Sequence, residues 1–453
     1  MTVPRFPRLA GRHGVAALGL AVLAATSPAR ADTPSPWTVS GSMRLRYEAL
    51  EGQVRPGFNA TDDLISLRTI LTGEYRRGSL RLGAEMYDSR AWGADRRSPL
   101  STGEVNTFEL VQAYAALDGE DETLGPVSLQ AGRFTVNLGS RRLVAADDYR
   151  NTTNGFTGVR LDLAPAGVKT TLIYAQPQVR LPDGLDALLD NRHRADRASR
   201  RLELFGGTAA RPNTLGGATL EGTFLRLVES DAPGRSTRNR RLNSFGLRVI
   251  RDPAAGGWDY ELEAIGQGGT IRQGLGAADP TLTVRAHFLH AEAGYTWNRP
   301  WKPHISAEFD LASGDKAGGR FGRFDSLFGT RRGDLAPSGI YNAIGRANIV
   351  TPGLRLEVTP SPRWDGFVAA RGLWLEAKED AFSTTGVRDP GGASGRFAGT
   401  QLEGRLRYWL VPGKLRAEAN GVWLDKARFL RQAPNAPPTG DERYVSLNLT
   451  GQF

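Results

Sequence analysis

Residues 444–453, with the sequence YVSLNLTGQF, indicate the fold class because their side chains alternate strictly in character. One face of this stretch carries Val445, Leu447, Leu449 and Phe453, and the other carries Ser446, Asn448, Thr450 and Gln452. A period of two is typical of a β-strand with two unlike faces. An unpaired hydrophobic strand edge invites aggregation, whereas a closed barrel pairs both edges of its last strand. The stretch therefore predicts a terminal strand that closes a β-barrel.

The other end of the chain has the features of a secretory signal. Three arginines, Arg5, Arg8 and Arg12, precede the apolar run 14–25 (GVAALGLAVLAA), and small residues follow in 26–31 (TSPARA). This order is typical of a cleaved signal peptide, and the run is too short to span a bilayer. We expect cleavage after Ala31, so that 1–31 is removed and 32–453 forms a single exported domain.

Composition excludes several kinds of site. The chain has no cysteine, which rules out disulfides, thiolate metal sites, cysteine nucleophiles and an acylated N-terminal cysteine. The net charge of +10 falls to +6 in 32–453, because the signal carries four arginines and no acid. A basic protein can bind nucleic acid, but an exported chain rarely meets any, so we expect no nucleic-acid partner.

The same alternation recurs along the whole exported chain. In 414–423 (KLRAEANGVW), for example, small and apolar residues alternate with charged and polar ones. Helical periodicity is absent apart from a turn or two near 185–189. The pattern predicts 18 strands: 37–50, 64–76, 79–90, 106–118, 127–134, 155–163, 168–178, 201–210, 217–228, 241–251, 258–268, 283–297, 302–313, 346–359, 363–378, 399–411, 414–426 and 443–453.

The lengths of the connections favour an outer-membrane barrel. Short turns such as 76–79 and 411–413 alternate with long polar segments such as 135–154 and 314–345. In such barrels the short turns are periplasmic and the long loops extracellular, and only helices or closed barrels satisfy every backbone group in lipid. We expect Phe453 to close the barrel against the first strand and to serve as the signal that the barrel-insertion machinery recognises. A secreted β-sandwich, propeller or solenoid is the alternative, but one face carries too many charges for a dry core.

Several motifs resemble the alginate export family over nearly the whole exported chain. They are 131–144 (AGRFTVNLGSRRLV), 148–151 (DYRN), 155–160 (GFTGVR), 313–315 (SGD), 324–328 (FDSLF) and 399–403 (GTQLE). The resemblance implies an 18-stranded outer-membrane barrel whose arginine-lined pore passes an anionic polysaccharide outward. One departure is Phe134, where the family usually has Gln. The resemblance therefore supports architecture and anion preference more strongly than alginate itself, since a fold does not fix a function.

The polar face of each strand is expected to line the pore. From the two ends of the chain, which are neighbours in a closed barrel, this face contributes a wall of nine arginines: Arg44, Arg46, Arg68, Arg81, Arg355, Arg371, Arg405, Arg407 and Arg416. Strands 258–268, 283–297 and 302–313 contribute an opposing acidic wall: Asp259, Glu261, Glu263, Glu292, Glu308 and Asp310. Guanidinium groups hold carboxylates through paired hydrogen bonds, and a ladder of weak sites suits permeation. Alternatively, the arginines only form ion pairs that hold a wide barrel open.

Segment 135–154 is short enough to fold inward and narrow the pore. It carries Arg142 and Arg150, and Arg133 lies at its root. Strict alternation would point Arg133 at lipid, so we expect a bulge or a rim position there.

Enzymatic function is disfavoured by the histidines. His287 and His290 are three apart in a strand and so face opposite ways, and His193 and His304 lie on separate segments. We therefore predict a passive outer-membrane channel that is selective for anions and has no cofactor or metal. We expect it to be a monomer in contact with lipid and lipopolysaccharide. An uptake porin for small organic acids or oligosaccharides, and a structural or adhesive barrel plugged by its own loops, remain as alternatives.

Overall fold

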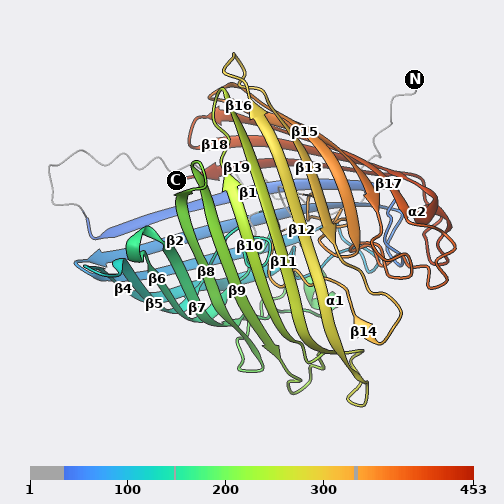
Figure 1. The fold of residues 1–453 in the computed structure, drawn as a ribbon, viewed down its shortest axis with the longest axis horizontal. Helices are drawn as coiled ribbons and strands as arrows, with labels where there is room; N and C mark the ends of the chain where they lie inside the picture. The colour runs from blue at the N-terminus through green and yellow to red at the C-terminus, as the bar shows by residue number, and fades with distance from the viewer. Residues whose placement is uncertain (1–34, 147–148, 331–334) are drawn as a thin grey trace. The chain divides into compact units, whose positions relative to one another are not determined.

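Strands make up nearly all the regular structure in the part of the chain that a computed structural model describes, residues 35–146, 149–330 and 335–453 (Figure 1). The expected signal peptide, 1–31, lies outside these residues. The strands are β1 (Trp37–Glu51), β2 (Thr61–Arg77), β3 (Leu80–Trp92), β4 (Asn106–Asp121), β5 (Gly125–Phe134), β6 (Phe156–Leu163), β7 (Lys169–Pro177), β8 (Leu202–Thr214), β9 (Ala218–Glu229), β10 (Arg241–Arg251), β11 (Gly257–Arg272), β12 (Thr281–Thr296), β13 (His304–Ala312), β14 (Arg320–Phe321), β15 (Ile349–Ser361), β16 (Trp364–Trp374), β17 (Phe397–Val411), β18 (Leu415–Lys426) and β19 (Glu442–Gln452). The short helices are η1 (Pro165–Gly167), α1 (Leu185–Leu189) and α2 (Arg428–Gln432).

Eighteen of these strands form a closed antiparallel barrel. Each pairs with its neighbour along the chain, β13 pairs with β15, and β19 pairs with β1. The predicted fold class is confirmed, and every predicted strand overlaps an observed one, with ends that differ by up to four residues. The additional strand β14 runs parallel to β12 inside a loop. Among the described residues, no helix is long and apolar enough to cross a membrane.

The seam between the first and last strands closes through backbone hydrogen bonds. Ser42 pairs with Gln452 in the β1–β19 register. Beyond this pair, the amide of Phe453 donates to the carbonyl of Gly41 at 3.0 Å, and the Gly41 amide donates back at 3.1 Å. A side chain at Gly41 would lie 2.6 Å from the Phe453 ring, so only glycine fits there. The role of Phe453 as an insertion signal stays a prediction.

The outer surface of the barrel is apolar, with aromatic residues near both ends of the strands. Aromatic pairs lie beside the short turns, namely Trp37–Tyr75, Trp258–Tyr295 and Trp364–Tyr408. Others lie toward the loops, namely Phe224–Phe245 and Trp374–Phe397. An apolar band between two aromatic girdles is the surface that a barrel presents to a bilayer.

Candidate functional site

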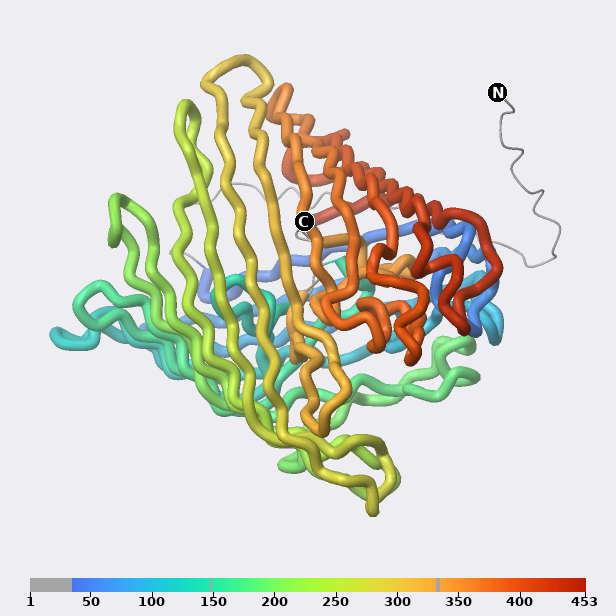
Figure 2. Tube along the Cα trace, turned by 45° about the vertical axis from the view of Figure 1, so that its right-hand side comes forward, coloured from blue at the N-terminus to red at the C-terminus, as the bar shows by residue number. Residues whose placement is uncertain are grey.

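Two long loops enter the lumen. One is loop 135–155, between β5 and β6, and the other is loop 313–348, between β13 and β15. In Figure 2 the teal segment after β5 and the orange segment after β13 run within the space that the strands enclose. Val144 and Phe328 form a parallel β-bridge, and the Phe328 amide donates to the Leu143 carbonyl at 2.9 Å. The two loops therefore form one structure, called here the inner loop pair.

An apolar core holds the inner loop pair together. Its fully buried members come from both loops and from the strand ends that flank them: Phe134, Val136, Leu138, Leu143, Val144, Phe156, Phe324, Ile340, Tyr341 and Ile344. Phe134 stacks on Phe156, with ring centroids 6.3 Å apart. Burial of this much apolar surface is the main driving force for the loops to pack inside the barrel and not in solvent.

Three arginines of the predicted wall bind loop 135–155. Nη2 of Arg44 donates to the Arg150 carbonyl at 2.8 Å, and Nη1 of Arg68 donates to the same carbonyl at 3.1 Å. The guanidinium of Arg46 lies 4.0 Å above the centre of the Tyr149 ring. Arg44 and Arg46 are buried. In this conformation these side chains therefore serve as anchors for the loop.

Arg142 crosses from the same loop to the predicted acidic wall. Its Nη1 lies 2.6 Å from Oε2 of Glu263 and also contacts Glu261. Arg248 on β10 adds a second cation, with Nε 2.9 Å from Glu261. Sequence reasoning missed Arg248, although it lies at an inward position in a predicted strand.

The remaining acidic residues are paired as well. Asp259 lies 3.1 Å from Nε2 of His304, and Asp310 lies 3.0 Å from Nδ1 of His290. Glu292 lies 3.8 Å from His290. Among the described residues, no group of three or more His, Asp or Glu side chains is arranged to hold a metal ion.

The expected separation into two facing walls needs correction. Nη2 of Arg371 on β16 lies 2.9 Å from Oε2 of Glu308 on β13, and both side chains are buried. The strand between them, β15, places Gly353 opposite both residues, so no side chain intervenes. The arginine and acidic walls therefore meet side by side, and Arg142 links them through the lumen.

Five predicted arginines lie nearer the short turns and are partly exposed. Called here the lower arginine cluster, they are Arg81, Arg355, Arg405, Arg407 and Arg416, with exposed side-chain fractions of 17, 11, 19, 29 and 29%. Asp118 binds Arg81 at 2.9 Å, and Asp365 lies 2.7 Å from Arg407 and 3.5 Å from Arg405. Glu357 binds Arg355 at 2.6 Å, and Glu418 lies 3.8 Å from Arg416. Sequence reasoning missed Asp118 and Asp365, although the alternation that selected Arg371 also turns Asp365 inward.

Arg133 lies at the loop end of β5, whereas Arg150 lies within loop 135–155, where its carbonyl binds Arg44 and Arg68. Arg133 follows Gly132, whose φ of +128° favours glycine, and its Nη2 donates to the Asp196 carbonyl at 3.0 Å. Arg133 also pairs with the buried carboxylate of Glu109. It thus lies next to the last residue of β5, at the start of loop 135–155.

Two loop carboxyls near this rim have raised pKa values. Burial raises the pKa of Glu104 to about 7, and its bonds from Ser101 offset only part of this effect. Burial, and then the charge of Glu109, raise the pKa of Asp196 to about 6. Glu104 belongs to loop 93–105, between β3 and β4. Its carbonyl accepts a hydrogen bond from Asn151 at 2.9 Å, which ties loop 93–105 to loop 135–155.

A closed 18-strand barrel with an apolar outer band and a charged lumen defines an outer-membrane channel of Gram-negative bacteria. Residues 36–441 match the family described as alginate export, and the chain belongs to this family. Several solved Pseudomonas aeruginosa structures have the same fold. OccK9 (OpdG) is 13% identical with a TM-score of 0.58, and OccK8 (OprE) is 11% identical with a TM-score of 0.56; each alignment covers 92% of this chain and 98% of the other. Among curated proteins, none matches.

The family motifs coincide with residues that fix the inner loop pair. Asn151 donates to the carbonyls of Leu67, Arg90 and Glu104. Gln401 accepts from the Tyr341 hydroxyl at 2.7 Å and donates to the Leu335 carbonyl at 2.9 Å. Asp148 of the second motif lies outside the described residues. Residues in two of these motifs thus hold the loops inside the barrel.

Proposed function

We propose that this channel passes anionic solutes, with an anionic polysaccharide of the alginate type, moving outward, as its cargo. Membership of the alginate export family supports the cargo class. The observation that carries the proposal is the lower arginine cluster, where Arg407 and Arg416 are each 29% exposed. Guanidinium groups that keep part of their surface in the lumen can bind a passing carboxylate.

Two contacts of the lower arginine cluster suit repeated weak binding, whereas Arg81, Arg355 and Arg407 have shorter ones. Arg405 lies 3.5 Å from Asp365, and Arg416 lies 3.8 Å from Glu418, so neither contact has the short distance of a strong charged hydrogen bond. A carboxylate of the cargo can replace such a partner at little cost and leave again. Permeation requires binding that is favourable enough for entry and weak enough for exit.

Passage beyond the lower arginine cluster requires the inner loop pair to move or to leave a gap beside it. Loop 135–155 is held on one side by Arg44 and Arg68 and on the other through Arg142. These contacts make loop 135–155 the element that we propose to control the open fraction of the channel.

Uptake of small organic acids is the second candidate function. The β-bridge between Val144 and Phe328 joins the two loops across the lumen, and a narrowed lumen favours a small solute. In that case a dicarboxylate would block the current more strongly, per carboxylate, than a polyuronate.

The test is a set of planar-bilayer recordings with the full-length protein, with and without added polyuronate. In the triple variant Arg405→Lys, Arg407→Lys and Arg416→Lys, chloride conductance should stay close to wild type, while block by the polyuronate weakens several-fold. Lysine keeps the charge but lacks the planar fork of arginine. Arg251→Lys, at an exposed position that ends β10, is the matched control. Unchanged block in the triple variant would show that these arginines are structural only.

A further inference from the structure

A basic surface lies outside the barrel, at the loop ends of β9 to β14. Alternation along β12 turns Arg285 and His287 outward, where both are exposed, while Ala286 and Phe288 are buried. Arg226 on β9 and Arg241 on β10 are exposed in the same way. Together with Lys316 and Arg320 of loop 313–348, these residues are called here the outer basic surface.

The strand register places these cations in two adjacent rows. In one row Arg226 pairs with Asn243, Asn243 with Gly268, and Gly268 with Arg285. In the next row Arg241 pairs with Thr270, Thr270 with Thr283, and Thr283 with Arg320 of β14. Because neighbouring strands are about 4.8 Å apart, each row extends over roughly 14 Å.

Between the cations the surface is open. A side chain added at Gly266 would meet nothing within 4 Å, and one added at Gly268 would meet only the Val284 carbonyl, at 3.9 Å. Beside these glycines a hollow of about 420 Å³ is lined by Arg285, His287, Lys316, Arg320 and Glu376, among others. A bulky polar group can therefore lie against the backbone with guanidinium groups on both sides.

The outer basic surface begins where the apolar band ends. The row directly below the two rows of arginines contains His287 and the aromatic pair Phe224–Phe245, whose ring centroids are 5.0 Å apart, and the following row contains Leu247 and Leu289. Interfacial aromatic residues mark the level of the lipid headgroups. The cations therefore lie at and just above the headgroup level on the loop side of the barrel.

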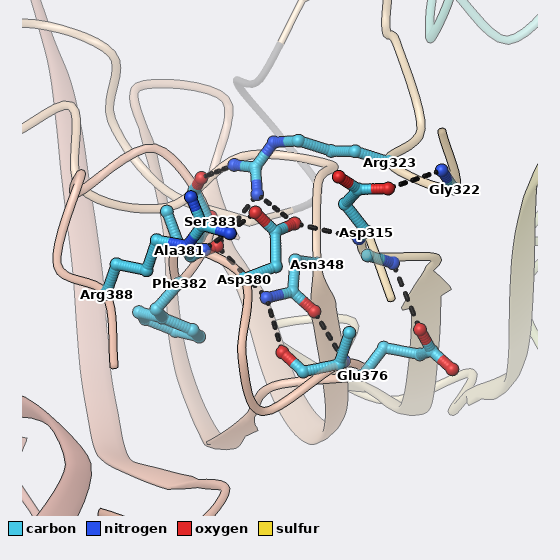
Figure 3. A network of polar contacts seen from close by, with 12 residues as sticks. Asp315, Gly322, Arg323, Asn348, Glu376, Asp380, Ala381, Phe382, Ser383 and Arg388 are labelled. Carbon is cyan, nitrogen blue, oxygen red and sulfur yellow. Dashed lines mark hydrogen bonds and ion pairs between the residues drawn. The ribbon is translucent and has the colours of Figure 1, made fainter. Parts of the chain in front are cut away.

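The segment that carries Lys316 and Arg320 is held rigidly (Figure 3). The Asp315 carboxylate accepts from the Gly322 amide at 2.9 Å, and Asp380 accepts from both the Asp315 amide and Arg323, at 2.9 and 2.7 Å. Glu376 accepts from the Gly314 amide at 3.0 Å. These bonds fix the position of the segment before any ligand arrives, which lowers the entropic cost of binding.

The charge of this surface is local. Its own acids are Glu203, which accepts from the Tyr174 hydroxyl, and Glu376, which pairs with Lys316. On the strands around the seam, outward residues at the loop ends are mixed in sign: Glu51, Asp63, Asp88, Arg90, Asp425 and Arg443. The strands around the seam therefore present a mixed surface at this level, whereas β9 to β14 present a mainly cationic one.

We infer that the outer basic surface binds the phosphate groups of lipopolysaccharide in the outer leaflet. Several cations spread over two rows match a ligand with more than one phosphate, and the open glycine backbone and the hollow leave room for its sugars. Basic pockets at the headgroup level bind anionic lipid headgroups by the same electrostatics. This binding is separate from solute passage, which takes place inside the barrel.

The test compares lipopolysaccharide binding by wild type and by the variant Arg226→Gln, Arg241→Gln, Arg285→Gln and Arg320→Gln, using native mass spectrometry of the full-length protein in detergent. Purified lipopolysaccharide should bind the variant at least about tenfold more weakly. The control Arg90→Gln and Arg443→Gln, on the seam side, should bind like wild type. Heat-resistant gel mobility checks that each barrel is folded.

Two further ligands make the result independent of the variants. Dephosphorylated lipopolysaccharide should bind wild type at least about tenfold more weakly than the intact molecule. Phosphatidylglycerol, with its single phosphate, should also bind weakly. Equal binding of intact and dephosphorylated lipopolysaccharide would overturn the inference, and so would binding of phosphatidylglycerol as tight as that of lipopolysaccharide.

Discussion

Arg142 and Glu263 lie 121 residues apart in the sequence, yet their side chains meet at 2.6 Å with only 4% of each exposed. The arginine comes from loop 135–155 and the glutamate from the wall strand β11. Taking two charges out of water is costly, so a buried pair is no proof of net stabilisation. Removal of one partner, however, leaves the other charge buried and unpaired, which makes the contact a sensitive test of how loop 135–155 is held.

We predict that Arg142→Ala loosens loop 135–155 and raises the open fraction of the channel. Loss of one partner of a buried ion pair costs about 3–5 kcal/mol, because the Glu263 carboxylate loses its counter-charge, while Glu261 keeps Arg248. Planar-bilayer recordings should show longer or larger openings. Arg96→Ala is the control, because Arg96 pairs with Asp186 in solvent, with 73 and 67% of the side chains exposed. Wild-type gating in Arg142→Ala would mean that the loop is held elsewhere.

The strands could be predicted because alternation is a local property of the sequence. Each predicted strand was found, and the inward direction of Arg44, Arg371 and Glu308 followed from the same alternation. Asp365 could have been found in this way too. A bulge or a rim position could be expected for Arg133, because strict alternation would point this charged side chain at lipid.

The partners of the lumen side chains could not be predicted, because they depend on contacts between distant segments. Alternation gives the face on which Arg44 lies, but not that the Arg150 carbonyl is there to accept its hydrogen bond. Likewise, nothing local in 313–348 shows that Phe328 pairs with Val144. The inward path of both loops follows from their buried apolar residues, which the polar composition of these segments conceals.

We predict that Gly41→Val impairs closure of the barrel. The new side chain would lie 2.6 Å from the Phe453 ring and 2.7 Å from the Ile70 carbonyl, so the β1–β19 seam would have to shift. Gly73→Val on β2 is a matched control, since nothing lies within 4 Å of a side chain added there. Heat-resistant gel mobility and outer-membrane yield measure closure. Equal yields of the two variants would argue against a tight seam.

We predict that the packing of loop 135–155 against loop 93–105 weakens as the pH rises. Because burial raises the pKa of Glu104 from 4.5 to about 7, the packed state binds more protons than a loosened state between these values. The packed state is therefore most stable at acid pH, and it loses on the order of 3 kcal/mol as the pH rises through this window.

Hydrogen exchange of the full-length protein at pH 5 and pH 8, corrected for the intrinsic rate, measures this effect. Protection in 149–155 should fall at the higher pH in wild type and stay constant in Glu104→Gln, which cannot ionise. Equal pH dependence in the two proteins would assign the effect to another group, with Asp196, whose pKa is raised to about 6, as the next to examine.

The last prediction concerns the carboxylate that two arginines share. Asp365 lies 2.7 Å from Arg407 and 3.5 Å from Arg405, with 26% of its side chain exposed. Asp365→Asn removes one negative charge from the lumen and leaves both guanidinium groups for the solute, so anion preference should increase. Arg405→Ser with Arg407→Ser should reduce the anion preference. The variant that combines Asp365→Asn, Arg405→Ser and Arg407→Ser should have a preference between those of these two proteins. Reversal potentials under a potassium chloride gradient give the preference directly. Asp252→Asn, in the exposed turn after β10, controls for the loss of one acid outside the lumen. If all variants share the wild-type reversal potential, the lower arginine cluster does not set selectivity, and its ion pairs only support the barrel wall.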